Sequence, residues 1–200
     1  MSITKAVEAV QKGDFIIITD ATDRENEGDL VFAAQFVSDE KIAFMLEHTS
    51  GIICVGMEQK RLDDLGLTMM VAHNTSKHGT PFTLPVDAKN MFDNGVSARD
   101  RALTIRTLME GGKSDLVIPG HVFPLRAHSK GVLERAGHTE ASVDICRLAG
   151  VYPAGALCEL MNKNGAMMRG RDLEEFAKRF KIPIVTIDEI EEYLRFKREI

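Results

Sequence analysis

The sequence has no apolar run that approaches the length of about 18 residues needed to cross a membrane. Its first residues, Met1 to Glu8, lack the basic and apolar regions of a signal peptide, so we expect a cytoplasmic protein with no membrane partner. A basic stripe is also missing, since 25 Lys and Arg face 30 Asp and Glu for a net charge of −5. Because nonspecific nucleic-acid binding requires cationic side chains on the phosphates, we expect no nucleic-acid partner.

Cysteine is scarce. Cys54, Cys146 and Cys158 are odd in number and lie in apolar segments, which predicts buried, reduced thiols. Internal repeats, low-complexity tracts and linkers are absent as well. At 200 residues, with 44% apolar and 28% charged residues, the chain is long enough to form a single core. We therefore expect residues 1–200 to form one domain.

Short apolar runs alternate along the chain with segments whose apolar residues recur at helical spacing. This alternation predicts one layered domain in which helices flank a sheet. The segment from Thr68 to Gly95 is irregular apart from one predicted strand, and irregular segments of this length are usually functional or mobile. Strands are expected at 15–19, 30–36, 52–55, 82–87, 121–127, 154–161 and 184–186. Helices are expected between Ser2 and Gly13, Ser38 and Gly51, near 62–65, at 97–109, 137–149 and 172–180, and after Thr186.

Charge is most concentrated between the first two predicted strands, in Asp20-Ala-Thr-Asp-Arg-Glu-Asn-Glu-Gly-Asp29. Five carboxylates there share one guanidinium, Arg24. Two carboxylates 4 Å apart repel by ~4 kcal/mol at the dielectric constant of a protein surface, so Arg24 cannot balance all five. The segment is therefore either a charged turn splayed into solvent or a site for a hard divalent cation. Its place just beyond strand ends, where layered α/β proteins bind ligands, favours the second interpretation.

A second cluster, Arg135-Ala-Gly-His-Thr139, precedes a predicted helix. Thr139 is the predicted N-cap, and the free N–H groups of a helix start favour an anion. Arg135 has a planar guanidinium suited to phosphate, and the imidazole of His138 can bind a metal, although a surface or capping histidine is the simpler alternative. Because the acidic segment attracts a cation and this cluster attracts an anion, the pair suits a metal-bound sugar phosphate.

Two further residues are candidates for proton transfer. Glu159 lies in an otherwise apolar predicted strand, where a carboxylate costs several kcal/mol unless it is paired, which is typical of a general acid or base. A frayed strand end or a nearby arginine is the alternative explanation for it. His121 opens a predicted strand after Pro119-Gly120 and could reach the sheet edge, although its spacing alone indicates a structural role.

Two other motifs are excluded. Gly112-Lys113-Ser114 imitates the end of a P-loop, but Thr107 stands where the first glycine is required. His73 and His78 have a loose metal spacing without cysteines or a helix, so we expect no zinc site there.

Taken together, five motifs resemble those of the 3,4-dihydroxy-2-butanone 4-phosphate synthases of riboflavin biosynthesis, over nearly the whole chain. The resemblance implies an α+β fold, a single-domain, three-layer α/β/α sandwich with a mixed sheet, and a homodimer. It also implies conversion of D-ribulose 5-phosphate to the butanone phosphate and formate with Mg²⁺ or Mn²⁺, two ions per site. The steps would be enolisation, dehydration, skeletal rearrangement and loss of C4. The motifs are Asp20 to Asp29, His48-Thr-Ser-Gly-Ile-Ile-Cys54, His73-Asn-Thr75 with His78-Gly-Thr80, Arg135-Ala-Gly-His-Thr-Glu-Ala141 and Leu157-Cys-Glu-Leu160.

The resemblance also implies roles for single residues. Glu25 and His138 would be the metal ligands, and His121 and Glu159 would be catalytic. Cys54 matches a cysteine near the family's site, but we expect it to be structural. The residues implied in substrate binding are Arg24, Glu25, Asp29, Arg135, Ala136, Gly137, His138, Thr139 and Glu159.

This chain departs from the family pattern in two respects. Many relatives continue into a GTP cyclohydrolase domain, so only the one activity is implied here. Pro81 and Pro85 flank Phe82 where a more regular strand is expected. Two alternative functions remain: a metal-dependent sugar-phosphate binder without turnover, and a nucleotide- or RNA-binding module of the similarly layered YrdC type.

Overall fold

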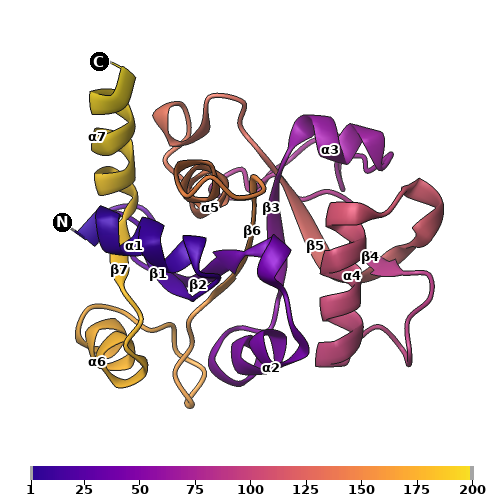
Figure 1. Ribbon diagram of the computed structural model, residues 1–200, viewed down its shortest axis with the longest axis horizontal. Coiled ribbons are helices and arrows are strands. Elements are labelled where there is room, and N and C mark those ends of the chain that lie inside the picture. The colour runs from indigo at the N-terminus through magenta and orange to yellow at the C-terminus, as the bar shows by residue number, and fades with distance from the viewer. Residues whose placement is uncertain (1, 199–200) are drawn as a thin grey trace.

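A computed structural model describes residues 2–198 of the chain, in which seven strands form one mixed sheet (Figure 1). The strand order is β4-β5-β3-β6-β2-β1-β7. The pairs β1–β7 and β3–β5 are parallel, and the other four pairs are antiparallel. The strands are β1 Ile16–Thr19, β2 Gly28–Ala33, β3 Cys54–Glu58, β4 Val86–Ala88, β5 Leu116–Ala127, β6 Ala154–Glu159 and β7 Ile184–Thr186.

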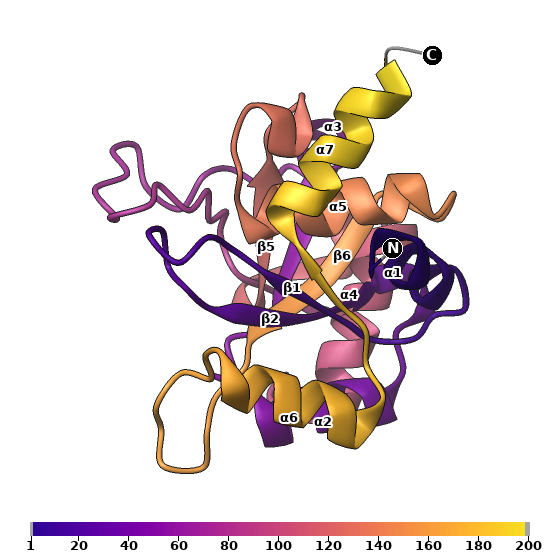
Figure 2. The same cartoon turned by 90° about the vertical axis from the view of Figure 1, so that its left-hand side faces the viewer.

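The helices lie on both faces of the sheet, which confirms the three-layer arrangement (Figures 1 and 2). Consecutive side chains of a strand point to opposite faces, and Ile17 packs in one buried cluster while Ile16 and Ile18 pack in the other. The first cluster lies beneath α2, α4 and α6, and the second beneath α1, α5 and α7. The α-helices are α1 Ser2–Gln11, α2 Asp39–His48, α3 Gln59–Asp64, α4 Ala98–Glu110, α5 His138–Leu148, α6 Arg171–Phe180 and α7 Ile187–Arg198. Among residues 2–198 no helix has the length and apolar character of a membrane span.

Most predicted helix ends are confirmed. The hydroxyl of Ser38 accepts from the Lys41 backbone N–H (3.3 Å), and that of Ser97 from the Asp100 N–H (3.1 Å), as N-caps do. At the start of α7, Thr186 and Glu189 cap each other's backbone N–H groups. Gly13, Gly66 and Gly150 end α1, α3 and α5 with φ values of 80°, 68° and 69°.

Several predicted boundaries are wrong. The strand expected at 30–36 ends at Ala33, and Ala34–Phe36 forms a 3₁₀ helix. The strand expected at 52–55 begins only at Cys54, and that expected at 154–161 ends at Glu159. The strand expected at 121–127 begins earlier, at Leu116, whereas of 82–87 only Val86 and Asp87 lie in a strand. Thr139 is not an N-cap: Gly137 occupies that position without a side-chain hydrogen bond. The strand errors have one cause, since apolar spacing does not show where a neighbouring strand stops pairing.

Candidate active site

The acidic segment forms the connection between the antiparallel strands β1 and β2, and Asp20 organises it. Its carboxylate accepts hydrogen bonds from Arg24 Nη1 (3.0 Å) and from the backbone N–H groups of Glu25 and Glu27 (2.9 Å each). Burial opposes the charge of Asp20, but these N–H groups, together with His138 and Arg24, lower its pKa. The segment is therefore a built loop rather than a turn splayed into solvent. Asp20 was not singled out from the sequence.

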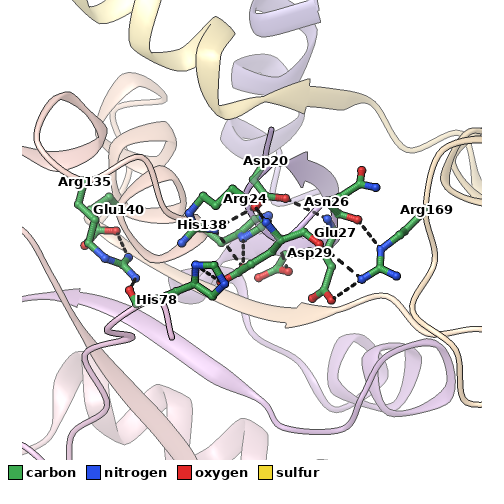
Figure 3. A network of polar contacts seen from close by, with 11 residues as sticks. Asp20, Arg24, Asn26, Glu27, Asp29, His78, Arg135, His138, Glu140 and Arg169 are labelled. Atoms are coloured by element: carbon green, nitrogen blue, oxygen red, sulfur yellow. Dashed lines mark hydrogen bonds and ion pairs between the residues drawn. The ribbon is translucent and has the colours of Figure 1, made fainter. Parts of the chain in front are cut away.

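The loop that contains Arg24 and Asn26 meets the N-terminus of α5 at His138, although the two segments are more than a hundred residues apart (Figure 3). Glu25 Oε2 lies 3.5 Å from His138 Nδ1, and ligand atoms of Asp20, Glu25 and His138 all lie within 4.8 Å of one another. On the other side of the imidazole, Nε2 is 4.0 Å from Asp29 Oδ1. The predicted meeting of Glu25 and His138 is confirmed.

Two atoms of this cluster are buried without a hydrogen-bond partner, Asp29 Oδ1 and His138 Nε2. Asp29 and His138 are only 5% and 6% exposed. Buried polar atoms are nearly always satisfied in folded proteins, so an unpaired acceptor and an unpaired ring nitrogen indicate a ligand. Carboxylate oxygens and imidazole nitrogen are suitable ligands for a divalent cation. The residues present therefore fit a metal ion.

The pKa values in this cluster follow from burial and mutual proximity. The pKa of Glu25 is lowered to about 2, chiefly by the hydrogen bond of its carboxylate with His138. Burial opposes this shift, and Arg24 assists it. Burial disfavours the charged form of His138, but Asp29, Glu25 and Asp20 outweigh burial and raise its pKa to about 9. Burial raises the pKa of Asp29 to about 7, against the effect of His138. A proton on His138 thus balances the carboxylates, and a metal bound to the imidazole must displace that proton.

A cavity of about 170 Å³ opens beside the cluster, with Phe82, Leu125 and Leu157 on its apolar side. Thr80 and Phe82 bring the irregular segment 68–95 to this cavity. Cys54, expected to be structural, is buried and also contributes to the lining. Seven of the nine residues implied in substrate binding line the cavity, and Ala136 and Gly137 do not; the seven are Arg24, Glu25, Asp29, Arg135, His138, Thr139 and Glu159.

Arg135 is held in place before any substrate binds. Its Nη1 donates to Glu140 Oε2 (2.6 Å) and its Nη2 to the carbonyl of His78 (3.0 Å). A Cβ atom at Gly137 would lie 2.2 Å from Arg135 Nη1, so glycine is required for this arrangement. Two nitrogens of the guanidinium that was predicted to suit phosphate therefore already have partners within the protein. His78, excluded as a zinc ligand, nevertheless lies near the site, with Nδ1 4.0 Å from Glu25 Oε1.

Glu159 lies directly opposite Asp29 in the pairing of β6 with β2. Its Oε2 accepts a hydrogen bond from Ser50 Oγ (2.6 Å), and Cys158 Sγ lies 3.2 Å from the same hydroxyl. Glu159 is the last residue of β6, as the frayed-end alternative expected, yet its carboxylate has a defined partner, which is a serine and not an arginine. Ser50 was not singled out from the sequence.

His121 lies on β5 outside the lining of this cavity, paired with a buried aspartate. Asp87 Oδ2 is 2.7 Å from His121 Nδ1, and Asp87 Oδ1 accepts the His121 backbone N–H (2.9 Å). The structure therefore does not bring His121 into contact with Glu25 and His138. Asp87 is 3% exposed and was missed, although it lies in a predicted strand, as Glu159 does.

A three-layer α/β/α sandwich with a buried cluster of carboxylates and imidazole at a helix start defines a class, that of metal-dependent enzymes acting on small polar molecules. The family model described as 3,4-dihydroxy-2-butanone 4-phosphate synthase matches residues 4–193. The chain belongs to this family of riboflavin-biosynthesis lyases, which the resemblance of the motifs had implied.

Individual relatives agree with this assignment. The 3,4-dihydroxy-2-butanone 4-phosphate synthase of Agrobacterium fabrum is 46% identical over 195 residues, covering 96% of this chain and 92% of the relative. That of Erwinia tasmaniensis is 46% identical over 200 residues, covering 99% of this chain and 92% of the relative. A crystal structure of a 3,4-dihydroxy-2-butanone 4-phosphate synthase in complex with two magnesium ions superimposes with a TM-score of 0.94 at 38% identity, covering 98% of this chain and 97% of that chain.

Proposed function

We propose that this chain converts D-ribulose 5-phosphate to L-3,4-dihydroxy-2-butanone 4-phosphate and formate. The observation that carries the proposal is the meeting of Glu25 and His138, with the unpaired Asp29 Oδ1 and His138 Nε2 beside them. This cluster needs a cation, and the adjoining arginines and helix start suit the phosphate of the substrate.

Glu25 and His138 would hold Mg²⁺ or Mn²⁺, with two ions in the complete site. The related structure that contains two magnesium ions supports this number. When bound, the metal supplies Lewis-acid polarisation of the neighbouring substrate oxygens. Asp20 is close enough to contribute, but its oxygens already accept three hydrogen bonds within the loop, so we assign it to holding Glu25 in place.

The chain's own residues would bind the substrate and move its protons. Within residues 2–198, Arg24 contacts Asp20 and Glu25, both through Nη1. The other guanidinium nitrogens of Arg24 can therefore donate to the phosphate. His138 and Thr139, the first two residues of α5, line the same cavity. Glu159, fixed by Ser50, would take the C3 proton and return protons in later steps. His121, oriented by Asp87, would serve as the second proton-transfer group.

Water must be excluded during the rearrangement, because the enediolate-type intermediates react with it. The segment 68–95 would do this, since Thr80 and Phe82 form part of the cavity wall. The His78 carbonyl also ties this segment to Arg135 (3.0 Å). Reaction in the cytoplasm agrees with the three cysteines, which are buried and free.

We also propose that the chain forms a homodimer through the segments that precede β3 and α4 and through β5. Four large apolar side chains of these segments are exposed: Ile52 (48%), Phe92 (60%), Val96 (49%) and Ile118 (46%). Exposed apolar side chains of this size mark interfaces when they form a patch. Sedimentation equilibrium should give twice the chain mass of 22.2 kDa, and Val96→Glu should shift it toward a monomer. A single-chain mass for the unmodified protein would exclude the dimer.

The proposed reaction is tested by incubating the protein with ribulose 5-phosphate and Mg²⁺ and measuring formate. Formate should accumulate in proportion to the butanone phosphate, and EDTA should stop it because the carboxylates and imidazole lose the cation they hold. Metal-dependent binding of ribulose 5-phosphate without formate would instead indicate a sugar-phosphate binder. Binding of nucleotide or RNA in its place would indicate a module of the YrdC type.

A further inference from the structure

The two proposed proton-transfer groups, Glu159 and His121, lie on strands that flank β3. Cys54 of β3 pairs with Leu157 of β6 and with Phe123 of β5. Ahead of β3, the Ile53 carbonyl accepts the Phe123 backbone N–H (3.0 Å), and the Ser50 backbone N–H donates to the Glu159 carbonyl (2.8 Å). The chain just before β3 therefore contacts both of the strands that carry Glu159 and His121.

This chain segment fixes Glu159. The hydroxyl of Ser50 donates to Glu159 Oε2 (2.6 Å), and the Ser50 backbone N–H donates to the Glu159 carbonyl (2.8 Å). Gly51 follows with a φ of 83°, a left-handed conformation that favours glycine. The position of Glu159 thus depends on how residues 50–52 are held.

His121 is fixed from the other side by the loop that precedes α4. A Cβ atom at Gly95 would lie 2.2 Å from Asp87 Oδ2 and 2.8 Å from His121 Nδ1, so this loop packs closely against the Asp87–His121 pair. The fully buried Asp100 holds the loop by accepting the backbone N–H groups of Phe92 (2.7 Å), Asp93 (3.1 Å) and Gly95 (3.1 Å).

One side chain contacts both the segment that fixes Glu159 and the loop that fixes His121. Arg101, in the first turn of α4, donates from Nη1 to the Gly51 carbonyl (2.8 Å) and from Nε to the Val96 carbonyl (2.9 Å). Its guanidinium is half-buried: burial lowers its pKa, and Cys158 and Asp87 act in the opposite direction. No carboxylate within residues 2–198 forms an ion pair with Arg101 at 4.0 Å or less, so two backbone carbonyls are its main partners.

We propose that Arg101 is a positioning residue that sets the placement of Glu159 relative to His121. The planar guanidinium holds two carbonyls at a fixed angle, which a lysine ammonium cannot do. Loss of Arg101 would release residues 50–52 and the loop before α4 independently. The expected effect on turnover rests on the proposed function, whereas the hold of Arg101 on residues 50–52 and on the loop before α4 does not.

The test compares Arg101→Ala with Arg106→Ala, an exposed arginine on the same helix that makes no hydrogen bond or ion pair within the described part of the chain. A misplacement of 1 Å can cost ~100-fold in rate, so kcat for formate release should fall by at least about tenfold in Arg101→Ala. KM should stay within about twofold, because Arg24 and Arg135 still hold the phosphate. Guanidinium chloride, added well below denaturing concentration, should restore much of the lost kcat. Arg106→Ala should behave as the unmodified protein.

A second readout does not require turnover. The ring ¹H–¹⁵N signals of His121, identified with His121→Gln, should shift or broaden in Arg101→Ala and return with guanidinium, while those of the exposed His73 stay unchanged. Unchanged His121 signals and an unchanged kcat in Arg101→Ala would overturn the proposal. Shifted His121 signals and a lowered kcat that guanidinium does not restore would also overturn it. If Arg101→Ala fails to fold, Arg101→Lys replaces it, and normal kcat in that variant also overturns it. Absence of formate from the unmodified protein would refute the proposed function and leave the His121 signals as the test of Arg101.

Discussion

Glu159→Gln is expected to release no measurable formate while still binding ribulose 5-phosphate and Mg²⁺. The amide has the size of the carboxylate and can still accept the hydrogen bond from Ser50 (2.6 Å), so the cavity should keep its shape. An amide cannot take up and return a proton, however, and general acid–base catalysis typically contributes ~100- to 10,000-fold. We expect kcat to fall by at least about a thousandfold, as measured by a formate-coupled assay, with calorimetry to check substrate binding.

Glu27→Gln is the matched control for this variant. Glu27 lines the same cavity, and its carboxylate pairs with Arg169 (3.1 Å) rather than with the proposed catalytic groups. Its turnover should stay within about tenfold of the unmodified protein. Normal turnover by Glu159→Gln would refute the assigned role.

Glu25→Gln is expected to weaken Mg²⁺ binding at least about a hundredfold. Glu25 is ionised, since its hydrogen bond with His138 lowers its pKa to about 2, and it reaches to 3.5 Å from the imidazole. A neutral amide removes one full charge from the cation site and is a weaker ligand for a hard ion. Titration calorimetry with Mg²⁺ measures the change, and Glu27→Gln again serves as the control. Equal affinities of Glu25→Gln and the unmodified protein would show that the ion is held elsewhere.

The elements themselves were predictable because their signals are local. Ser38 and Ser97 cap helices through groups three residues away, and Gly13, Gly66 and Gly150 end helices by their own left-handed conformation. Strand ends were less predictable, since they depend on pairing partners. Ala34 is as apolar and as buried as Ala33, yet the strand stops between them.

The site was predictable where charge density or the family motifs identified it. Glu25 and His138 belong to segments that attract opposite charges, and the structure brings them together. Ser50 lies within one of the family motifs, but neither Ser50 nor Asp87 was singled out, because their roles arise from contacts with Glu159 and His121, which lie 109 and 34 residues away. Arg101 was missed for the same reason: both of its partners are backbone carbonyls, which any sequence provides.

Glu25 and His138 are proposed to hold one cation between them. This arrangement is tested most directly with Mn²⁺ as the probe, by recording electron spin-echo modulation from protein labelled with ¹⁵N only at histidine. Coupling from one directly bound histidine nitrogen is expected, and His138→Asn should abolish it while His73→Asn should leave it unchanged. Mn²⁺ bound without nitrogen coupling, or coupling that survives in His138→Asn, would contradict the account.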